Sequence, residues 1–417
     1  MNLRVAILAA TSLPWHRHGG LERHVFQLCR WLRRRDVAVD LYLSRPEHSV
    51  DPFGGDPGFR FHRIPGTPFL RQRFFVIATR STLYPLFSLR MGKRVAKDAL
   101  RAEYSAVIAQ GMAGFGYAVH SRRLGAAAPL ILNPQGMEEA ITPSAAKRAL
   151  YAPFRALTRF TARRAAAVIA TDRILVDTVQ SVFDVPRERI LVIPNAIDVA
   201  ECLAQADPAR GAAVCERLGI AAAAPVLVTV GRLAPNKGYE VGLEALSRLR
   251  AELPATWRWI VVGEGPLRAG LEHEVRRRGL AASVSFTGSL SDADMHSLLA
   301  RADLFLNPTL YEGSSLVTLE AMSHGCAVVA SRAGGIPDKI EEGVTGWLAE
   351  PGDAASLAGA IARWWTAGDA ARARIRAAAA ERCRQRFDWP RCADRYVEVI
   401  RALGARSGEP PHCQRES

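Results

Sequence analysis

The sequence lacks the patterns that mark disulfide-rich, zinc-binding and membrane-spanning proteins. Its 417 residues include seven cysteines, an odd number spread along the chain without a C-x-x-C pair. This usage favours reduced thiols in a cytoplasmic protein over a disulfide framework or a zinc site. No run reaches the roughly 18 uninterrupted apolar residues that span a bilayer, because the best candidate, 74–91, contains Arg80 and Pro85. The apolar opening at 2–13 leads straight into a polar stretch, so it indicates a buried first strand rather than a signal peptide.

Acidic residues are scarce in the first half of the chain. Residues 1–198 hold 29 Lys and Arg against 15 Asp and Glu, whereas residues 199–417 hold 26 of each, so the first half carries the whole net charge of +14. The electrostatic field of this positive excess favours an anionic partner: a membrane surface, a phosphorylated glycan or nucleic acid. An arginine-rich composition with solvated faces would give the same excess. No aromatic-rich RNA-binding motif or recognition helix is present, which makes nucleic acid an unlikely partner.

Short apolar runs alternate with helical patterns in two series. Because the runs are continuous, they indicate parallel strands covered on both faces. The first series predicts strands at 3–9, 37–43, 106–109, 129–133, 167–170 and 190–193, with a helix at 21–34. The second predicts strands at 225–230, 259–262, 284–286, 304–307 and 327–330, with helices at 240–253, 266–278, 292–300 and 315–324.

These series predict an α/β protein of two doubly wound, Rossmann-like domains, 1–198 and 199–386, whose ligands bind at the carboxyl ends of the strands. Residues 199–224 are interpreted as a looser, alanine-rich segment. Helical patterns at 354–386 and 391–403 complete the fold, and 406–417 is predicted to be a disordered tail.

The stretch 304–322 joins an apolar strand, a polar turn and a helix. A glycine turn before a helix presents free backbone N–H groups to an anion. Glu312 and Glu320 flank this anion site, where carboxylates are suited to accept hydrogen bonds from hydroxyls attached to a phosphate. A sugar nucleotide has phosphates flanked by hydroxyls on both sides. The anion-binding residues would be Gly313, Ser314, Ser315 and Leu316.

Other strand ends in the second half carry glycines and cations. Arg232 and Lys237 follow a strand, together with Gly231, and can converge on one diphosphate through charge-assisted hydrogen bonds. Gly263 forms a tight turn at the same edge, and Gly288 ends a strand where a side chain would obstruct a flat base.

Two other motifs have mainly structural interpretations. Asp292 and Asp294 form a D-x-D pair, but Ser291 before them is a plausible N-cap and acids suit the first helical turn, so no metal is needed. The turns at 333–338 and 343–348 are interpreted as structural.

In the first half, Gly19 and Gly20 stand between a strand and a helix, which lets a ligand approach the helix N-terminus. His16, His18 and His24 lie nearby without cysteine partners, so they are interpreted as surface or acceptor-facing histidines rather than metal ligands.

Taken together, these motifs resemble those of the retaining glycosyltransferases of family four, which have the two-domain GT-B fold with a cleft between facing domains. The resemblance covers nearly the whole chain, and its centre is the E-x7-E pair Glu312/Glu320. The other matching segments are 19–22, 194–198, 231–238, 263–266, 286–288, 334–335 and 343–346.

The resemblance implies a role for each matched residue. Arg232 and Lys237 would bind the donor diphosphate, Glu312 would hold hydroxyls of the donor sugar, and Glu320 would hold those of the ribose. Backbone N–H groups of Ser315 and Leu316 would contact phosphate. Gly19 and Gly20 would let the first domain close over the diphosphate, and 387–405 would cross back to that domain. No cofactor or metal is implied.

The chain departs from the family pattern at two positions. The family often has His-Gly after a strand of the first domain, whereas this chain has Gln135-Gly136, and Gln110-Gly111 one strand earlier. Glutamine can hydrogen-bond a sugar hydroxyl but is no useful base, so Gln135 is placed near the donor sugar and the role of the family's histidine is left unassigned. Asp338 stands where the family more often has glutamate.

The leading hypothesis is a cytoplasmic hexosyltransferase that uses a UDP- or GDP-sugar and an envelope glycan or lipid-linked acceptor, working at the inner face of an anionic membrane. A sugar-nucleotide epimerase on the same fold and a non-catalytic nucleotide- or nucleic-acid-binding protein are the alternatives. A dehydrogenase is disfavoured because Gly19-Gly20 is not part of a G-x-G-x-x-G motif.

Overall fold

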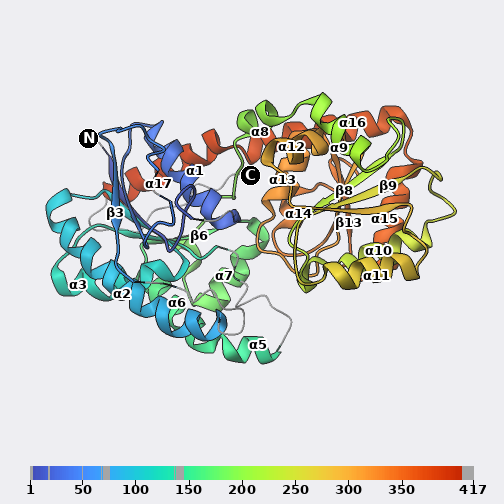
Figure 1. The fold of residues 1–417 in the computed structure, drawn as a ribbon. Helices are drawn as coiled ribbons and strands as arrows, with labels where there is room; N and C mark the ends of the chain where they lie inside the picture. The colour runs from blue at the N-terminus through green and yellow to red at the C-terminus, as the bar shows by residue number, and fades with distance from the viewer. Residues whose placement is uncertain are drawn as a thin grey trace. The chain divides into compact units, whose positions relative to one another are not determined.

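The computed structural model describes residues 3–16, 19–48, 50–66, 68, 76–135, 137 and 145–405. The predicted tail at 406–417, His18 and Gly136 lie outside these residues. The described chain divides into two compact units. One comprises the residues up to Asn195 together with those from Trp389 onward, and the other is Ala196–Asp388 (Figure 1).

A parallel sheet with the strand order β3-β2-β1-β4-β5-β6-β7 forms the centre of the first unit. The sequence predicts six of these strands. It misses β3 because that strand has partly exposed arginines in place of a continuous apolar run. The strands are β1 Arg4–Leu8, β2 Ala38–Leu43, β3 Phe59–Arg63, β4 Ala106–Gln110, β5 Leu130–Asn133, β6 Ala167–Ala170 and β7 Ile190–Val192.

Helices α1 and α17 of this unit contact each other, and α2, α3 and α6 contact one another (Figure 1). Alternate residues of β1, Ala6 and Leu8, belong to a core that also contains buried side chains of α2, α3, α6 and α7. The helices are α1 Gly20–Arg33, α2 Val76–Ala102, α3 Phe115–Leu124, α5 Ala145–Leu150, α6 Ala152–Arg164, α7 Val176–Phe183 and α17 Trp389–Gly404. None of the described helices is long and apolar enough to cross a membrane.

Two of the histidines interpreted as surface or acceptor-facing, His16 and His24, are buried, so a surface position is wrong for them. His16 Nε2 lies 3.2 Å from Ser44 Oγ, and its Nδ1 lies 3.1 Å from the Ser12 carbonyl oxygen. His24 packs against Trp389, with ring centroids 5.3 Å apart, and neither ring nitrogen has a hydrogen-bond partner among the described residues. Burial lowers the pKa of His24 to about 4.

The second unit is built on a parallel sheet with the strand order β10-β9-β8-β11-β12-β13. Its strands are β8 Val226–Val230, β9 Arg258–Val262, β10 Val284–Gly288, β11 Leu304–Asn307, β12 Ala327–Ser331 and β13 Gly346–Ala349. The interpretation of 343–348 as a turn is wrong for its second part, because β13 is a buried edge strand that pairs with β12.

Helices cover both faces of this sheet. Val226 and Val228 share a core with side chains from one set of helices, while Leu227 of the same strand packs into the opposite core. The first set is α8 Val199–Gln205, α9 Pro208–Arg217, α12 Asp292–Arg301, α13 Leu316–Ser323 and α16 Asp369–Arg386. The opposite set is α10 Tyr239–Arg248, α11 Arg268–Arg277 and α15 Ala354–Thr366, and the short α14 Ile336–Lys339 follows β12. Two parallel sheets with helices between their strands confirm the predicted α/β class.

The sequence suggested that the segment 199–224 is loose, but that interpretation is wrong. Asp198 and Asp207 cap α8 and α9 by accepting hydrogen bonds from backbone N–H groups, and both helices contact α12. Gly211 allows the close approach of α9 to α12, because a Cβ there would lie 2.6 Å from the Ser297 carbonyl oxygen.

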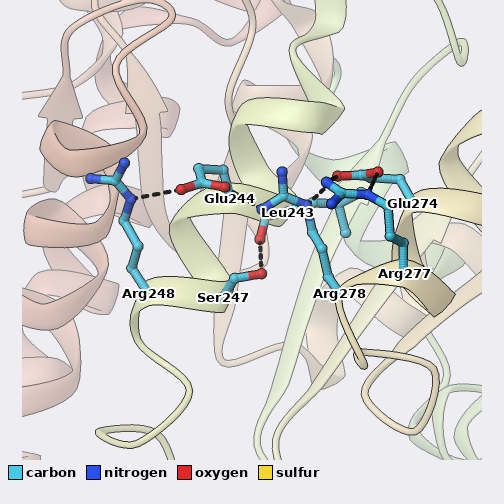
Figure 2. A network of polar contacts seen from close by, with 7 residues as sticks. All are labelled: Leu243, Glu244, Ser247, Arg248, Glu274, Arg277 and Arg278. Atoms are coloured by element: carbon cyan, nitrogen blue, oxygen red, sulfur yellow. Dashed lines mark hydrogen bonds and ion pairs between the residues drawn. The ribbon is translucent and has the colours of Figure 1, made fainter.

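Some of the acidic and basic side chains of the second half form ion pairs with each other. On α10 and α11, Glu244 pairs with Arg248 and with Arg278, and Glu274 pairs with Arg277 and Arg278 (Figure 2). Arg277 and Arg278 together lower the pKa of Glu274 to about 2. Such surface pairs add little stability individually. The two glutamates offset two of the three arginine charges on this face.

Candidate functional site

The strand order of the second sheet reverses between β8 and β11, which are neighbours. In doubly wound sheets the ligand binds outside the carboxyl ends of the strands at this kind of switch point. The segment after β8 carries Arg232 and Lys237, and the segment after β11 carries Glu312. The fold therefore brings together, at one sheet edge, predicted site residues that are far apart in the sequence.

Lys237 and Glu312 form an ion pair across this switch point, from Nζ to Oε2. Their side chains are 21% and 18% exposed, so a ligand can reach both. The sequence interpretation gave the two residues separate roles and did not foresee the contact. As paired, they offer a cation beside a hydrogen-bond acceptor, which suits a phosphate group next to a hydroxyl.

The loop that carries Glu312 is fixed on one side by the segment around Asn236. The Asn236 carbonyl oxygen accepts hydrogen bonds from Leu310 N and from Thr309 Oγ1, both at 2.8 Å. Gly238 has a φ of 63°, and a Cβ there would lie 2.0 Å from the Pro308 carbonyl oxygen. Glycine is thus required beside Lys237 by close approach to the loop that carries its partner.

The glycine pair after β12 fixes the other side of this loop. Gly335 N donates to the Gly313 carbonyl oxygen at 2.8 Å. Gly334 has a φ of 51°, and a Cβ there would lie 1.6 Å from the Glu312 carbonyl oxygen. The pair interpreted as a structural turn therefore holds the backbone of Glu312 and Gly313.

Sequence reasoning missed Lys339, a fully buried lysine on α14. Its Nζ donates to Ser314 Oγ at 2.9 Å and to the Gly335 carbonyl oxygen at 3.1 Å, and lies 5.8 Å from the Phe387 ring centroid. Burial of a lysine without hydrogen-bond acceptors would be costly, and these two oxygens offset that cost. The one sequence signal was a lysine among the apolar positions Ile336 and Ile340.

The start of α13 lies directly after this loop. Ser315 is its N-cap and is buried, but its hydroxyl accepts from Thr318 Oγ1 at 2.9 Å and does not cap a backbone N–H. Asn307 at the end of β11 donates to Thr318 Oγ1 at 3.1 Å. Leu316 begins the helix, and Glu320 lies within it, 5% exposed. The backbone donors at 315–316 therefore follow Glu312 in the chain by three and four residues, at the start of α13.

Three predicted glycines connect the ends of β8, β9 and β10. Gly231 N donates to the Val262 carbonyl oxygen, and Gly263 N donates to that of Gly288, both at 2.9 Å. A Cβ on Gly263 would lie 2.1 Å from the Gly231 carbonyl oxygen, and one on Gly288 would lie 2.6 Å from Glu264 Oε1. Close approach of the backbone therefore explains Gly263, and a left-handed φ of 74° explains Gly288 without a bound base. At Gly231 the nearest neighbour of a Cβ would be Tyr239 Oη at 3.4 Å, so packing does not require a glycine there.

Arg232 differs from Lys237 because its side chain is exposed and has no polar partner among the described residues. A guanidinium at the end of β8 with no internal contact is available to an anionic ligand. The D-x-D pair has a different role, as predicted. Ser291 Oγ accepts from Asp294 N at 3.1 Å, so the two aspartates form the first turn of α12.

The first unit holds the remaining predicted residues. Gly19 is the N-cap of α1 and is exposed, and a Cβ there would lie 2.2 Å from Glu22 Oε2, while Gly20 begins the helix. Gln135 follows β5 with a φ of 62°, and its Nε2 donates to Gln110 Oε1 at 2.7 Å. The predicted roles of these residues remain predictions.

Family comparisons agree with these motifs. Residues 18–201 match Glycosyltransferase Family 4, and residues 224–367 match Glycosyl transferases group 1. The alpha-D-kanosaminyltransferase of Streptomyces kanamyceticus is 30% identical over 290 residues, which cover 67% of this chain and 71% of that enzyme. The chain belongs to the family-four, group-one glycosyltransferases.

Two further proteins are similar to this glycosyltransferase over different shares of its length. The 2-deoxystreptamine glucosyltransferase of Streptomyces kanamyceticus is 28% identical over 249 residues, 57% of this chain and 64% of that enzyme. The chain thus spans less than two thirds of that relative. The structure of HepE from Anabaena in complex with UDP has a TM-score of 0.70 at 23% identity, covering 96% of this chain and 100% of HepE. That similarity confirms the GT-B fold.

Proposed function

We propose that this glycosyltransferase moves a hexose from a UDP- or GDP-linked donor to a cell-envelope glycan or lipid-linked acceptor, with retention of configuration and without a metal. The observation that carries the proposal is the Lys237–Glu312 pair at the β8/β11 switch point, beside the start of α13 and the free guanidinium of Arg232. Cations, backbone donors and a carboxylate together match a diphosphate joined to a hydroxylated sugar.

In the proposed reaction, the bond between the sugar anomeric carbon and the diphosphate oxygen breaks. The acceptor hydroxyl oxygen forms a new bond to that carbon on the same face, and its proton passes to the departing diphosphate. Arg232 and Lys237 stabilise the negative charge that builds on the leaving diphosphate, as do the backbone N–H groups of Ser315 and Leu316. Glu312 accepts hydrogen bonds from sugar hydroxyls, and Glu320 from those of the ribose.

The names of other family members support the donor and the hexose. HepE was solved with UDP, and the streptomycete relatives are named as glucosyl- and kanosaminyltransferases. The acceptor assignment rests on the positive charge of residues 1–198, which favours a phosphorylated or lipid-linked acceptor at the inner face of an anionic membrane. The enzyme would then be cytoplasmic and peripheral on that membrane.

A thermal-shift and hydrolysis screen against a panel of nucleotide sugars tests the proposal. We expect a UDP- or GDP-sugar to raise the melting temperature, and Arg232→Ala to remove the shift without lowering the melting temperature of the free protein, because the guanidinium has no internal partner. The exposed, ion-paired Arg248→Ala is the matched control and should keep the shift. An unchanged melting temperature across the whole panel would contradict the proposed donor class.

A further inference from the structure

The side-chain amides of Gln110, which is buried, and Gln135, which is half-buried, meet at the carboxyl edge of the first sheet. The strand order of that sheet reverses between β1 and β4, so the end of β4 lies at a switch point. Gln110 is the last residue of β4, and Gln135 stands two residues beyond the end of β5. Their contact, from Gln135 Nε2 to Gln110 Oε1 at 2.7 Å, joins the two strand ends.

A chain of hydrogen bonds holds Gln135 from the opposite side. The backbone N of Gln135 donates to Asn133 Oδ1 at 3.0 Å, and Asn133 Nδ2 donates to Tyr396 Oη on α17 at 3.3 Å. Asn133 and Tyr396 are almost fully buried. Both the backbone and the side chain of Gln135 are therefore fixed by neighbours that cannot move independently of the core.

Two features of this arrangement are unfavourable for stability. Gln135 adopts a left-handed φ of 62°, which side chains other than glycine, asparagine and aspartate seldom take. Gln110 is 2% exposed, and its Nε2 has no hydrogen-bond partner among the described residues. Strained backbone and partnerless buried polar groups persist where the surrounding structure enforces them, and they cluster at functional sites.

We propose that Gln110 is a positioning residue for sugar transfer, holding the Gln135 amide so that Gln135 Oε1 accepts a hydrogen bond from a sugar hydroxyl at the carboxyl edge of the first sheet. The hydrogen bond from Gln135 Nε2 to Gln110 fixes the direction of the amide, and Oε1 is the acceptor that the Gln135 side chain offers to a ligand. This inference rests on the proposed function and adds a residue that does not itself contact the sugar. Gln110 Oε1 fixes the direction of the Gln135 side-chain amide, and Gln135 Oε1 contacts the sugar hydroxyl.

The test is Gln110→Met, which keeps the length of the side chain while removing both the acceptor for Gln135 and the partnerless buried donor. We expect kcat to fall about tenfold, the loss that accompanies one misplaced hydrogen bond, with a change of less than about threefold in donor KM. The melting temperature should stay level or rise, because a buried N–H without a partner has been removed. Gln27→Met, at another buried glutamine of the same unit, is the matched control and should leave kcat unchanged.

A double-mutant cycle with Gln135→Met separates positioning from an ordinary packing role. If Gln110 acts through Gln135, the double variant has the kcat of Gln135→Met alone, because the second change removes nothing further. Additive losses in kcat would overturn the inference, as would a lower melting temperature of Gln110→Met with unaltered kcat. Absence of transfer by the unaltered enzyme with every donor would refute the proposed function instead, and this inference with it.

Discussion

The carboxyl edges of the two sheets present different chemistry at their switch points. In the second unit the edge carries charge: the Lys237–Glu312 ion pair and the guanidinium of Arg232. In the first unit the ends of β4 and β5 carry the neutral amides Gln110 and Gln135. A charged edge suits a diphosphate, and an amide edge suits hydroxyls. The predicted site residues at the edge of the first sheet therefore carry none of the large positive charge of the first half of the chain.

The largest expected effect comes from breaking the charged edge at Lys237. Lys237→Ala removes a cation and leaves the Glu312 carboxylate unpaired beside the phosphates, so we expect nucleoside diphosphate affinity to fall roughly 100-fold. Isothermal titration calorimetry measures this loss. The double variant Lys237→Ala/Glu312→Gln should recover part of the affinity, because the unpaired carboxylate is gone. Equal affinities of the single and double variants would show that the pair does not act as a unit.

Replacement of Glu312 should separate chemistry from nucleotide binding. In Glu312→Gln the acceptor for sugar hydroxyls loses its charge but keeps an oxygen, so we expect kcat to fall about 30-fold, less than the roughly 100-fold or more that follows complete loss of one transition-state contact. Lys237 is released from its partner, so the affinity for free nucleoside diphosphate should be unchanged or higher. Steady-state kinetics and calorimetry of the same preparation give both values. A parallel fall in nucleotide affinity would mean that Glu312 does not face the sugar.

The smallest expected effect on activity concerns His24 in the first unit, where a buried group stays uncharged. Burial lowers the pKa of His24 to about 4 in the folded state, against about 6.5 in an unfolded chain. Between these values the unfolded state binds more protons, so the stability contribution is complete above about pH 6.5 and is lost as the pH falls towards 4. The loss amounts to about 3 kcal/mol.

His24→Phe keeps a ring against Trp389 and removes the titration. Melting temperatures between pH 7 and pH 4 should therefore fall less steeply for the variant than for the unaltered chain, while kcat at neutral pH is the same. Burial also lowers the pKa of His324 to about 4. Its titration contributes equally to the pH dependence of the variant and of the unaltered chain, so it does not affect the difference between their slopes. Identical pH slopes would contradict a buried neutral His24.

The parts of the fold that follow from local sequence were predictable. Continuous apolar runs located eleven strands, because a strand covered on both faces needs such a run. The edge strand β3 has exposed arginines, and β13 is a four-residue run after a glycine turn, so neither gave that signal. The helices α8 and α9 were missed because their alanine-rich sequence has few large apolar residues to mark a buried face.

The candidate site was only partly predictable, because its contacts depend on topology. The residues Lys237 and Glu312 were both selected from their motifs, but their pairing requires β8 and β11 to be neighbours. Likewise, the contact between Gln110 and Gln135 requires the left-handed backbone at Gln135. Lys339 gave almost no signal, because its partners are a serine hydroxyl from another loop and the carbonyl oxygen of Gly335, the N-cap of its own helix.

We propose that the charged carboxyl edge of the second sheet binds the nucleoside diphosphate. Hydrogen–deuterium exchange with and without UDP or GDP tests it most directly, because it reports where a ligand protects the backbone. We expect protection at 231–238 and 308–318 with at least one of the two nucleotides, and no change at 222–226 and 301–304, where β8 and β11 begin. Protection confined to those strand starts, or no protection at 231–238 and 308–318 with either nucleotide, would contradict it.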